Sequence, residues 1–190
     1  MTSLTVDYIT SLDGFGAADG WPGLWGMGGP EYFAFLGDDA RNDYTLLMGA
    51  NTYRLFEGFA KAGQEGIEDL TARPKVAFSR SMQAPLAWAN TTLVSGDAVA
   101  AIREMKQTSN LPLRTIGSPS LCRALLGAGL VDRYRVVVFP VVNGATGRDR
   151  IYDGWPDVAL EPITIQTFDG KLQFFEFAPT PLEGPPNDGA

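Results

Sequence analysis

The chain has 190 residues, of which 45% are hydrophobic and 19% charged, and its formal net charge is −7. This length and balance are typical of one globular domain with a full hydrophobic core. The negative charge disfavours nucleic acids and anionic membranes as partners, and no apolar run approaches the ~20 residues that span a bilayer. The N-terminus lacks the basic start and long apolar stretch of a signal peptide, so we expect a cytoplasmic protein.

Histidine does not occur in the sequence. Its absence excludes Ser–His and Cys–His catalysis and histidine metal sites, and we expect no metal. The single cysteine, Cys122, excludes an internal disulfide and lies in an apolar helical pattern that is typical of core packing. Proton transfer would therefore use carboxylates, tyrosine, lysine, bound water or a cofactor.

Strands and helices alternate along most of the chain. A strand at 4–11 ends at Asp13-Gly14, a turn signal, and residues 14–30 form a long glycine-rich loop. The elements that follow are a helix at 30–43, a strand at 44–49, a helix at 52–62, strands at 75–79 and 91–96, a helix at 97–107, a strand at 113–117, a helix at 118–129, a strand at 134–142, and two strands within 159–178 joined at Asp169-Gly170. This order predicts an α/β fold with a mixed, mostly parallel sheet and a C-terminal antiparallel hairpin. We expect a single domain over residues 1–178 and a flexible Pro/Gly-rich tail over 179–190.

Three junctions after predicted strands have the composition of anion-binding turns. They are Met48-Gly49-Ala50-Asn51-Thr52, Phe78-Ser79-Arg80-Ser81 and Ile116-Gly117-Ser118-Pro119-Ser120. Free backbone N–H groups and the positive end of a helix dipole favour phosphate at such turns. Turn geometry and N-capping explain each junction alone, but three in one chain favour a dinucleotide. None of them is a P-loop or a GxGxxG motif.

The ordered set of motifs resembles the dihydrofolate reductase superfamily. The set is S-L-D-G, M-G-x-x-T-Y, S-R, I-G-S-x-S-L, V-D-x-(Y/L)-R and P-V-V-x-G. More narrowly, it is similar to the reductase domain of bacterial riboflavin biosynthesis and to stand-alone relatives of that domain, over roughly residues 4–178. The resemblance implies a three-layer fold around a sheet of about eight strands, NADPH as hydride donor, and a homodimer.

The resemblance also assigns cofactor-binding residues. They are Phe15, which covers the nicotinamide; Gly49, Ala50, Asn51 and Thr52 at the pyrophosphate; Ser79 and Arg80 at the adenosine ribose and its 2′-phosphate; and Gly117, Ser118, Pro119, Ser120 and Leu121 where the cofactor passes the sheet. The folate enzymes carry arginine where this chain has Ala50, so the preference for NADPH over NADH rests on Arg80. The loop at 14–30 would be a mobile lid that excludes water.

Two carboxylates are candidates for the proton donor. Glu31 and Phe35 have the spacing of the acid and the aromatic residue that hold the pterin ring in the folate enzymes, although Glu31 is equally a first-turn helix acid. Asp13 lies at a strand end, where burial would raise its pKa and let it donate a proton. An ordered water is the third option. The candidate substrate-binding residues are Trp21, Phe35 and Arg148.

These features predict an NADPH-dependent reductase that transfers a hydride to a C=N or C=O bond of a small, flat molecule, with a heterocycle as one option. Two alternatives stay open at this point. One is a dinucleotide-binding protein without turnover, and the other is a non-redox biosynthetic enzyme on the same fold.

Overall fold

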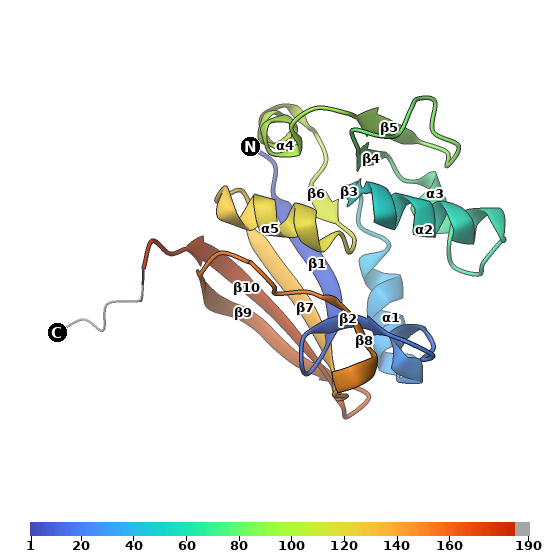
Figure 1. Cartoon of the computed structure of the whole chain (residues 1–190), viewed down its shortest axis with the longest axis vertical. Coiled ribbons are helices and arrows are strands. Elements are labelled where there is room, and N and C mark those ends of the chain that lie inside the picture. The colour runs from blue at the N-terminus through green and yellow to red at the C-terminus, as the bar shows by residue number, and fades with distance from the viewer. Residues whose placement is uncertain (185–190) are drawn as a thin grey trace.

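The computed structural model describes residues 1–184 and centres on one eight-stranded sheet (Figure 1). Its strands are β1 (Leu4–Ser11), β3 (Thr45–Gly49), β4 (Lys75–Phe78), β5 (Thr91–Val94), β6 (Leu113–Thr115), β7 (Arg133–Phe139), β9 (Val158–Phe168) and β10 (Leu172–Pro181). The strand order is β5-β4-β3-β6-β1-β7-β10-β9, with parallel pairing from β5 to β7 and antiparallel pairing of β10 with both neighbours. The predicted α/β fold with a mixed, mostly parallel sheet and a closing hairpin is confirmed.

Helices cover both faces of the sheet, which is why the central strands are apolar on both sides. The helices are α1 (Pro30–Asp39), α2 (Ala50–Lys61), α3 (Glu68–Ala72), α4 (Ala98–Thr108) and α5 (Pro119–Gly127). Residues of α4 and α5 pack with Leu47 and Val136, whereas residues of α1 and α2 pack with Met48 or Val137. Because consecutive strand residues point to opposite faces, α4 and α5 form one layer and α1 to α3 the other.

The segment expected to be a free loop at 14–30 is instead partly ordered into secondary structure. It contains β2 (Phe15–Ala18) and a short 3-10 helix, η1 (Gly23–Gly26). β2 pairs with β8 (Gly147–Arg150), which follows a second 3-10 turn, η2 (Gly144–Thr146), and the two strands form a separate small sheet. Neither strand has the length or alternation by which strands are recognised in a sequence.

Element ends differ from the predictions in two places that matter. The helix predicted at 30–43 ends at Asp39, and β10 continues to Pro181, so residues 179–181 belong to the sheet rather than to a tail. Of the predicted tail, residues 185–190 lie outside the described residues. Within residues 1–184, no helix has both the length and the apolar character needed to cross a bilayer.

Lys75 is an unusual core residue at the start of β4. Lys75 is only 1% exposed, and its ammonium donates to the backbone carbonyls of Leu70, Thr71 and Arg73 at 2.7–2.9 Å. Burial lowers the pKa of Lys75 to about 8. The ammonium thereby closes the C-terminal end of α3, whose last carbonyls would otherwise lack donors.

Candidate functional site

Two helix N-termini lie next to each other at the carboxyl edge of the sheet. α2 begins directly after Gly49 at the end of β3, and α5 begins after Ser118, which follows the neighbouring parallel strand β6. The hydroxyl of Ser118 accepts from the Gly49 amide at 2.9 Å and donates to Oγ1 of Thr52 at 2.9 Å. The structure therefore joins the first and third predicted junctions through one side chain.

The turn before α5 is built for close approach to α2. Gly117 and Ser118 both have left-handed backbones, with φ of +52° and +59°. A Cβ on Gly117 would lie 3.5 Å from Oγ1 of Thr52, and the left-handed conformation favours glycine there. Ser118 accepts this conformation at a cost of about 1–2 kcal/mol, and its buried hydroxyl makes the bridge to α2.

Neither of these two helices has a side-chain cap. Gly49 and Ser118 precede α2 and α5 without a capping hydrogen bond, and Pro119 opens α5 without an N–H group. By contrast, Asp97 caps α4, and Asp169 accepts from the first amides of α1. The first-turn amides of α2 and α5 are therefore available to an anion, as helix N-termini favour. The residues predicted to bind the cofactor at these two turns, which the structure places in the first turns of α2 and α5, are Ala50, Asn51, Thr52, Ser120 and Leu121.

The third junction lies along the same edge, one strand further out. Phe78 of β4 is in register with Gly49, and Ser79 follows it, where its hydroxyl accepts from the amides of Ser81 and Met82 at 3.2 Å. Arg80 is exposed and has no ion pair within residues 1–184. Arg80 therefore lies just beyond the carboxyl end of β4 with no ion pair among the described residues.

Arg54 is a cation that the sequence reasoning missed. It lies one turn into α2, and its guanidinium donates to Oδ1 of Asn51 at 3.3 Å. A positive charge therefore stands beside the first turn of α2 although Ala50 carries none. The (i, i+3) spacing of Asn51 and Arg54 on a predicted helix was the signal that could have found it.

Asp13 is an ionised anchor, and the expectation of a raised pKa is wrong. Its carboxylate accepts from the Ser11 hydroxyl at 2.7 Å and from the amides of Asn143 at 3.1 Å and Gly144 at 2.9 Å. These hydrogen bonds, with that from Ser11 the largest, lower the pKa of Asp13 to about 2. Asp13 therefore carries no proton at neutral pH and ties the end of β1 to the loop after β7.

Glu31 and Phe35 are both engaged in contacts of the fold. Glu31 accepts from the Asp169 amide at 2.5 Å while the Asp169 carboxylate accepts from the Glu31 amide at 3.0 Å, a reciprocal cap between α1 and the β9–β10 turn. The ring of Phe35 packs on Phe168 with centroids 4.8 Å apart. Glu31 and Phe35 also line an open groove of about 450 Å³ between α1 and β9.

Phe15 is covered rather than open. It is 6% exposed, and its ring lies where a Cβ on Gly147 would meet it at 2.5 Å. The guanidinium of Arg150 lies 4.8 Å from the ring centroid on the paired strand β8. Phe15 therefore joins β2 to β8, and it lies at the end of β1 where the nicotinamide was expected.

The two remaining substrate-binding candidates lie on the outside of this small sheet. Trp21 is 46% exposed, and Arg148 forms an exposed ion pair with Asp19. The buried indole in this segment is instead that of Trp25, which is 5% exposed. Its Nε1 donates to Oδ1 of Asn143 at 2.8 Å, and its backbone is left-handed, with φ of +49°.

Comparison with known proteins identifies the family. Residues 2–174 match the model of the RibD C-terminal domain. The chain belongs to this family. No curated protein matches the sequence.

Solved structures show the same fold at low sequence identity. A protein attributed to riboflavin biosynthesis in Shewanella sp. PV-4 is 19% identical, with a TM-score of 0.69 over 94% of this chain and 99% of that one. A pyrimidine reductase-like protein from Corynebacterium diphtheriae is 16% identical, with a TM-score of 0.60 over 94% and 92%. The Thermotoga maritima deaminase and 5-amino-6-(5-phosphoribosylamino)uracil reductase is 12% identical, with a TM-score of 0.65 over 94% of this chain and 57% of its own. The fold of this RibD C-terminal domain is therefore of the dihydrofolate reductase type, as the motifs implied.

A buried charge network holds α1 against the sheet of this RibD C-terminal domain. Arg114 of β6 pairs with Asp7 of β1 and with Asp39 at the end of α1, and Arg135 of β7 pairs with Asp39 at 3.1 Å. Burial raises the pKa of Asp39, but Arg114 and Arg135 lower it more, so it lies below the usual value. The network fixes the helix that flanks the carboxyl edge.

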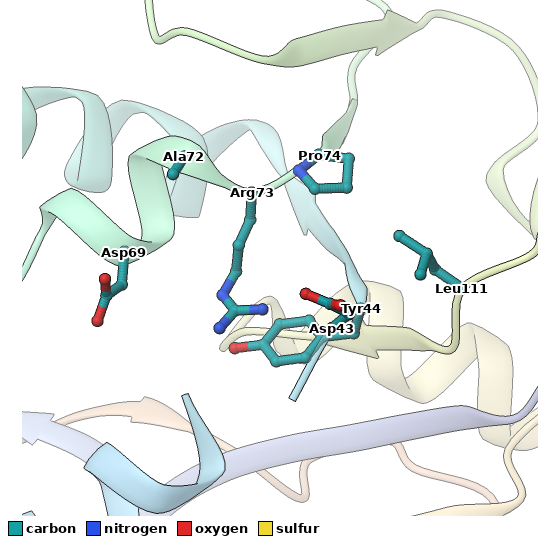
Figure 2. A pocket seen from close by; sticks show the side chains of 7 residues that line it. All are labelled: Asp43, Tyr44, Asp69, Ala72, Arg73, Pro74 and Leu111. Carbon is teal, nitrogen blue, oxygen red and sulfur yellow. The ribbon is translucent and has the colours of Figure 1, made fainter. Parts of the chain in front are cut away.

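A second cavity lies at the opposite edge of the sheet (Figure 2). Its volume is about 240 Å³, and it is lined by Asp43, Tyr44, Asp69, Ala72, Arg73, Pro74 and Leu111. Tyr44, Pro74 and Leu111 precede β3, β4 and β6, which places the cavity at the amino ends of these strands. The Arg73 guanidinium lies 4.1 Å from the Tyr44 centroid and donates to the Asn42 carbonyl at 2.6 Å. Arg73 thus donates to the backbone that follows α1, and the cavity is separate from the junctions at the carboxyl edge.

Proposed function

We propose that this RibD C-terminal domain is an NADPH-dependent reductase that transfers a hydride to a C=N or C=O bond of a small heterocycle. The observation that carries the proposal is the pair of uncapped helix N-termini, α2 and α5, which the Ser118 hydroxyl holds together. Two adjacent sets of free amides suit the two phosphates of a dinucleotide. The names of the structural relatives, which include pyrimidine and uracil-type reductases, support a pyrimidine-like ring as substrate.

The residues of the chain would divide the work as follows. The first-turn amides of α2 and α5 would bind the pyrophosphate, and Gly117 would let it approach the backbone. Arg80, or Arg54 on α2, would bind the 2′-phosphate. Bound NADPH would supply the hydride. The β2–β8 sheet would exclude water from the end of β1.

The proton would come from a water molecule. Asp13 holds no proton at neutral pH, because its hydrogen bonds lower its pKa to about 2. One oxygen of the Glu31 carboxylate accepts from the Asp169 amide in the β9–β10 turn. Neither carboxylate is thus free to act as the acid, and a water held near the substrate would take that role.

Titration with NADPH and NADH tests the cofactor assignment, using nicotinamide fluorescence with the wild type, Arg80→Ala and Arg54→Ala. We expect the wild type to bind NADPH more tightly than NADH. We expect Arg80→Ala to weaken NADPH about tenfold and leave NADH unchanged, because only NADPH carries the 2′-phosphate. If the ratio of NADPH to NADH affinity is unchanged in Arg80→Ala but falls in Arg54→Ala, Arg54 rather than Arg80 binds the 2′-phosphate. Failure of the wild type to bind either dinucleotide would refute the proposal.

A second candidate is a dinucleotide-binding protein without turnover. The observation in its favour is that both carboxylates predicted as proton donors are engaged, Asp13 with the loop after β7 and Glu31 with Asp169. NADPH oxidation with a panel of pyrimidines, pterins and imines separates the two. Binding of NADPH without oxidation by any of the panel would favour the second candidate.

A further inference from the structure

Asn143 has one polar group that the protein leaves unused. Asn143 is 7% exposed and lies in the loop after β7, where its backbone N–H donates to the Asp13 carboxylate at 3.1 Å. Its backbone carbonyl accepts from the amide and the hydroxyl of Thr146, and its Oδ1 accepts from Nε1 of Trp25 at 2.8 Å. Its Nδ2 is buried and has no hydrogen-bond partner in residues 1–184.

The indole N–H of Trp25 fixes the orientation of the Asn143 side-chain amide. An indole N–H only donates, so the amide must turn its oxygen toward Trp25 and its NH₂ group away. Exchanging the two amide atoms would place two donors against each other and leave the oxygen unused instead. Buried side-chain donors are nearly always paired, and within residues 1–184 Nδ2 is one of four buried side-chain atoms without a partner, with the Tyr8 hydroxyl and the Nε atoms of Arg73 and Arg135. Held in this orientation, the Asn143 side-chain amide can donate to an acceptor from outside these residues.

The position of Asn143 points to the ligand. It lies between the end of β1, through Asp13, and the turn that carries Trp25, on the α1 side of the sheet where Trp25 packs with Tyr32. Leu24 and Trp25 in this turn both have positive φ, at +54° and +49°, a conformation that L-residues rarely adopt. Such strain concentrates at ligand sites, and this turn contacts the Asn143 side chain directly through Trp25.

We propose that Asn143 is a substrate-recognition residue whose Nδ2 donates a hydrogen bond to an acceptor oxygen on the substrate. The identification of that ligand as the substrate, a heterocycle with a ring carbonyl, rests on the proposed function. A site built to donate to a carbonyl discriminates strongly against an analogue that lacks it, because the buried donor is then left unpaired. Asn143 would therefore set specificity for carbonyl-bearing rings.

Binding of two matched probes without NADPH tests this role. Uracil carries carbonyl oxygens, and 2,4-dithiouracil keeps the ring and its N–H groups but replaces the oxygens with sulfur, a weak acceptor. We expect calorimetry to show that the affinity of the wild type for uracil is at least about tenfold higher than its affinity for dithiouracil. Asn143→Asp keeps an acceptor for Trp25 and removes the donor, so the preference should disappear. Asn143→Ala, which adds no charge beside Asp13, serves as the second variant if the first does not fold.

Trp25→Phe is the control for a purely structural role. It removes the indole N–H, but the Asn143 side chain keeps its NH₂ group and can turn it toward a ligand carbonyl, so the preference for uracil should persist. Loss of the preference to the same extent in Trp25→Phe would overturn the proposal, as would an unchanged preference in both Asn143 variants. Equal binding of the two probes by the wild type, or binding of neither, would overturn it too, since a buried water then suffices for Nδ2. These outcomes do not depend on NADPH, whose failure to bind would refute the reductase alone.

Discussion

Replacing Ser118 by alanine tests whether one hydroxyl holds the two helix N-termini together. Serine and alanine both carry a Cβ, so the strain of φ at +59° is the same in both, and the comparison isolates the hydroxyl. In the variant the Gly49 amide loses its acceptor and Oγ1 of Thr52 loses its donor, because both form 2.9 Å hydrogen bonds with the Ser118 hydroxyl. The turn before α5 would then have no polar link to α2 through this side chain.

The expected loss is about 2–3 kcal/mol in the free energy of unfolding. An unpaired, half-buried amide costs about 1–3 kcal/mol, and an ordinary hydrogen bond contributes about 0.5–1.5 kcal/mol. For a chain of this size the loss corresponds to a fall in Tm of roughly 4–12 °C. We also expect NADPH binding to weaken about tenfold, because the two sets of amides would no longer share one geometry.

Urea denaturation and NADPH titration of wild type, Ser118→Ala and Ser118→Gly measure these effects. Ser118→Gly lacks the same hydroxyl but removes the left-handed strain, so we expect it to be about 1 kcal/mol more stable than Ser118→Ala. Both variants should bind NADPH more weakly than the wild type. A Ser118→Ala protein with unchanged stability and unchanged NADPH affinity would refute the reasoning.

Two further predictions concern buried charges. Arg114→Met leaves the Asp7 carboxylate without a guanidinium and leaves Asp39 with Arg135 alone, so we expect it to lower the unfolding free energy by about 3–5 kcal/mol in urea denaturation. The exposed Arg41→Ala should change it by less than ~0.5 kcal/mol, and similar effects of the two variants would contradict the buried network. The pKa of Lys75 is lowered from 10.5 to about 8, so between these pH values the unfolded chain binds a proton that the folded chain does not. The unfolding free energy should therefore rise between pH 8 and 10, by up to ~3 kcal/mol, and Lys75→Met should lack this rise. A wild-type curve parallel to that of Lys75→Met over this range would contradict the lowered pKa.

The fold was predictable because its main elements carry strong local patterns. The buried runs of β3 and β4 and the apolar alternation of β1 are long enough to recognise, and helices alternate with them. β2 and β8 escaped because their sequences, FGAA and GRDR, show neither a buried apolar run like that of β4 nor a clear alternation, and the paired residues lie far apart in the chain. Their pairing depends on tertiary contacts that no local pattern encodes.

The site was predictable in outline and not in its electrostatics. The composition of the turns at Gly49 and Gly117 indicated anion binding, but the link through Ser118 joins segments whose proximity only the sheet order reveals. Asp13 was expected to gain a proton on burial, whereas the amides of the distant loop after β7 stabilise its charge. The cap that Glu31 shares with the β9–β10 turn has the same long-range origin.

The strand order has a consequence for the way the domain is made. β1 leaves the ribosome first but lies at the centre of the sheet, between β6 at 113–115 and β7 at 133–139. Until β6 and β7 have been synthesised, β1 has neither of its neighbouring strands. Until Asp169 has been synthesised, the first amides of α1 lack the carboxylate that accepts from them. Because so many native pairings join distant residues, we expect the domain to fold late in synthesis rather than segment by segment. A chain that ends before Asp169 therefore lacks β10 and also the carboxylate that accepts from the first amides of α1.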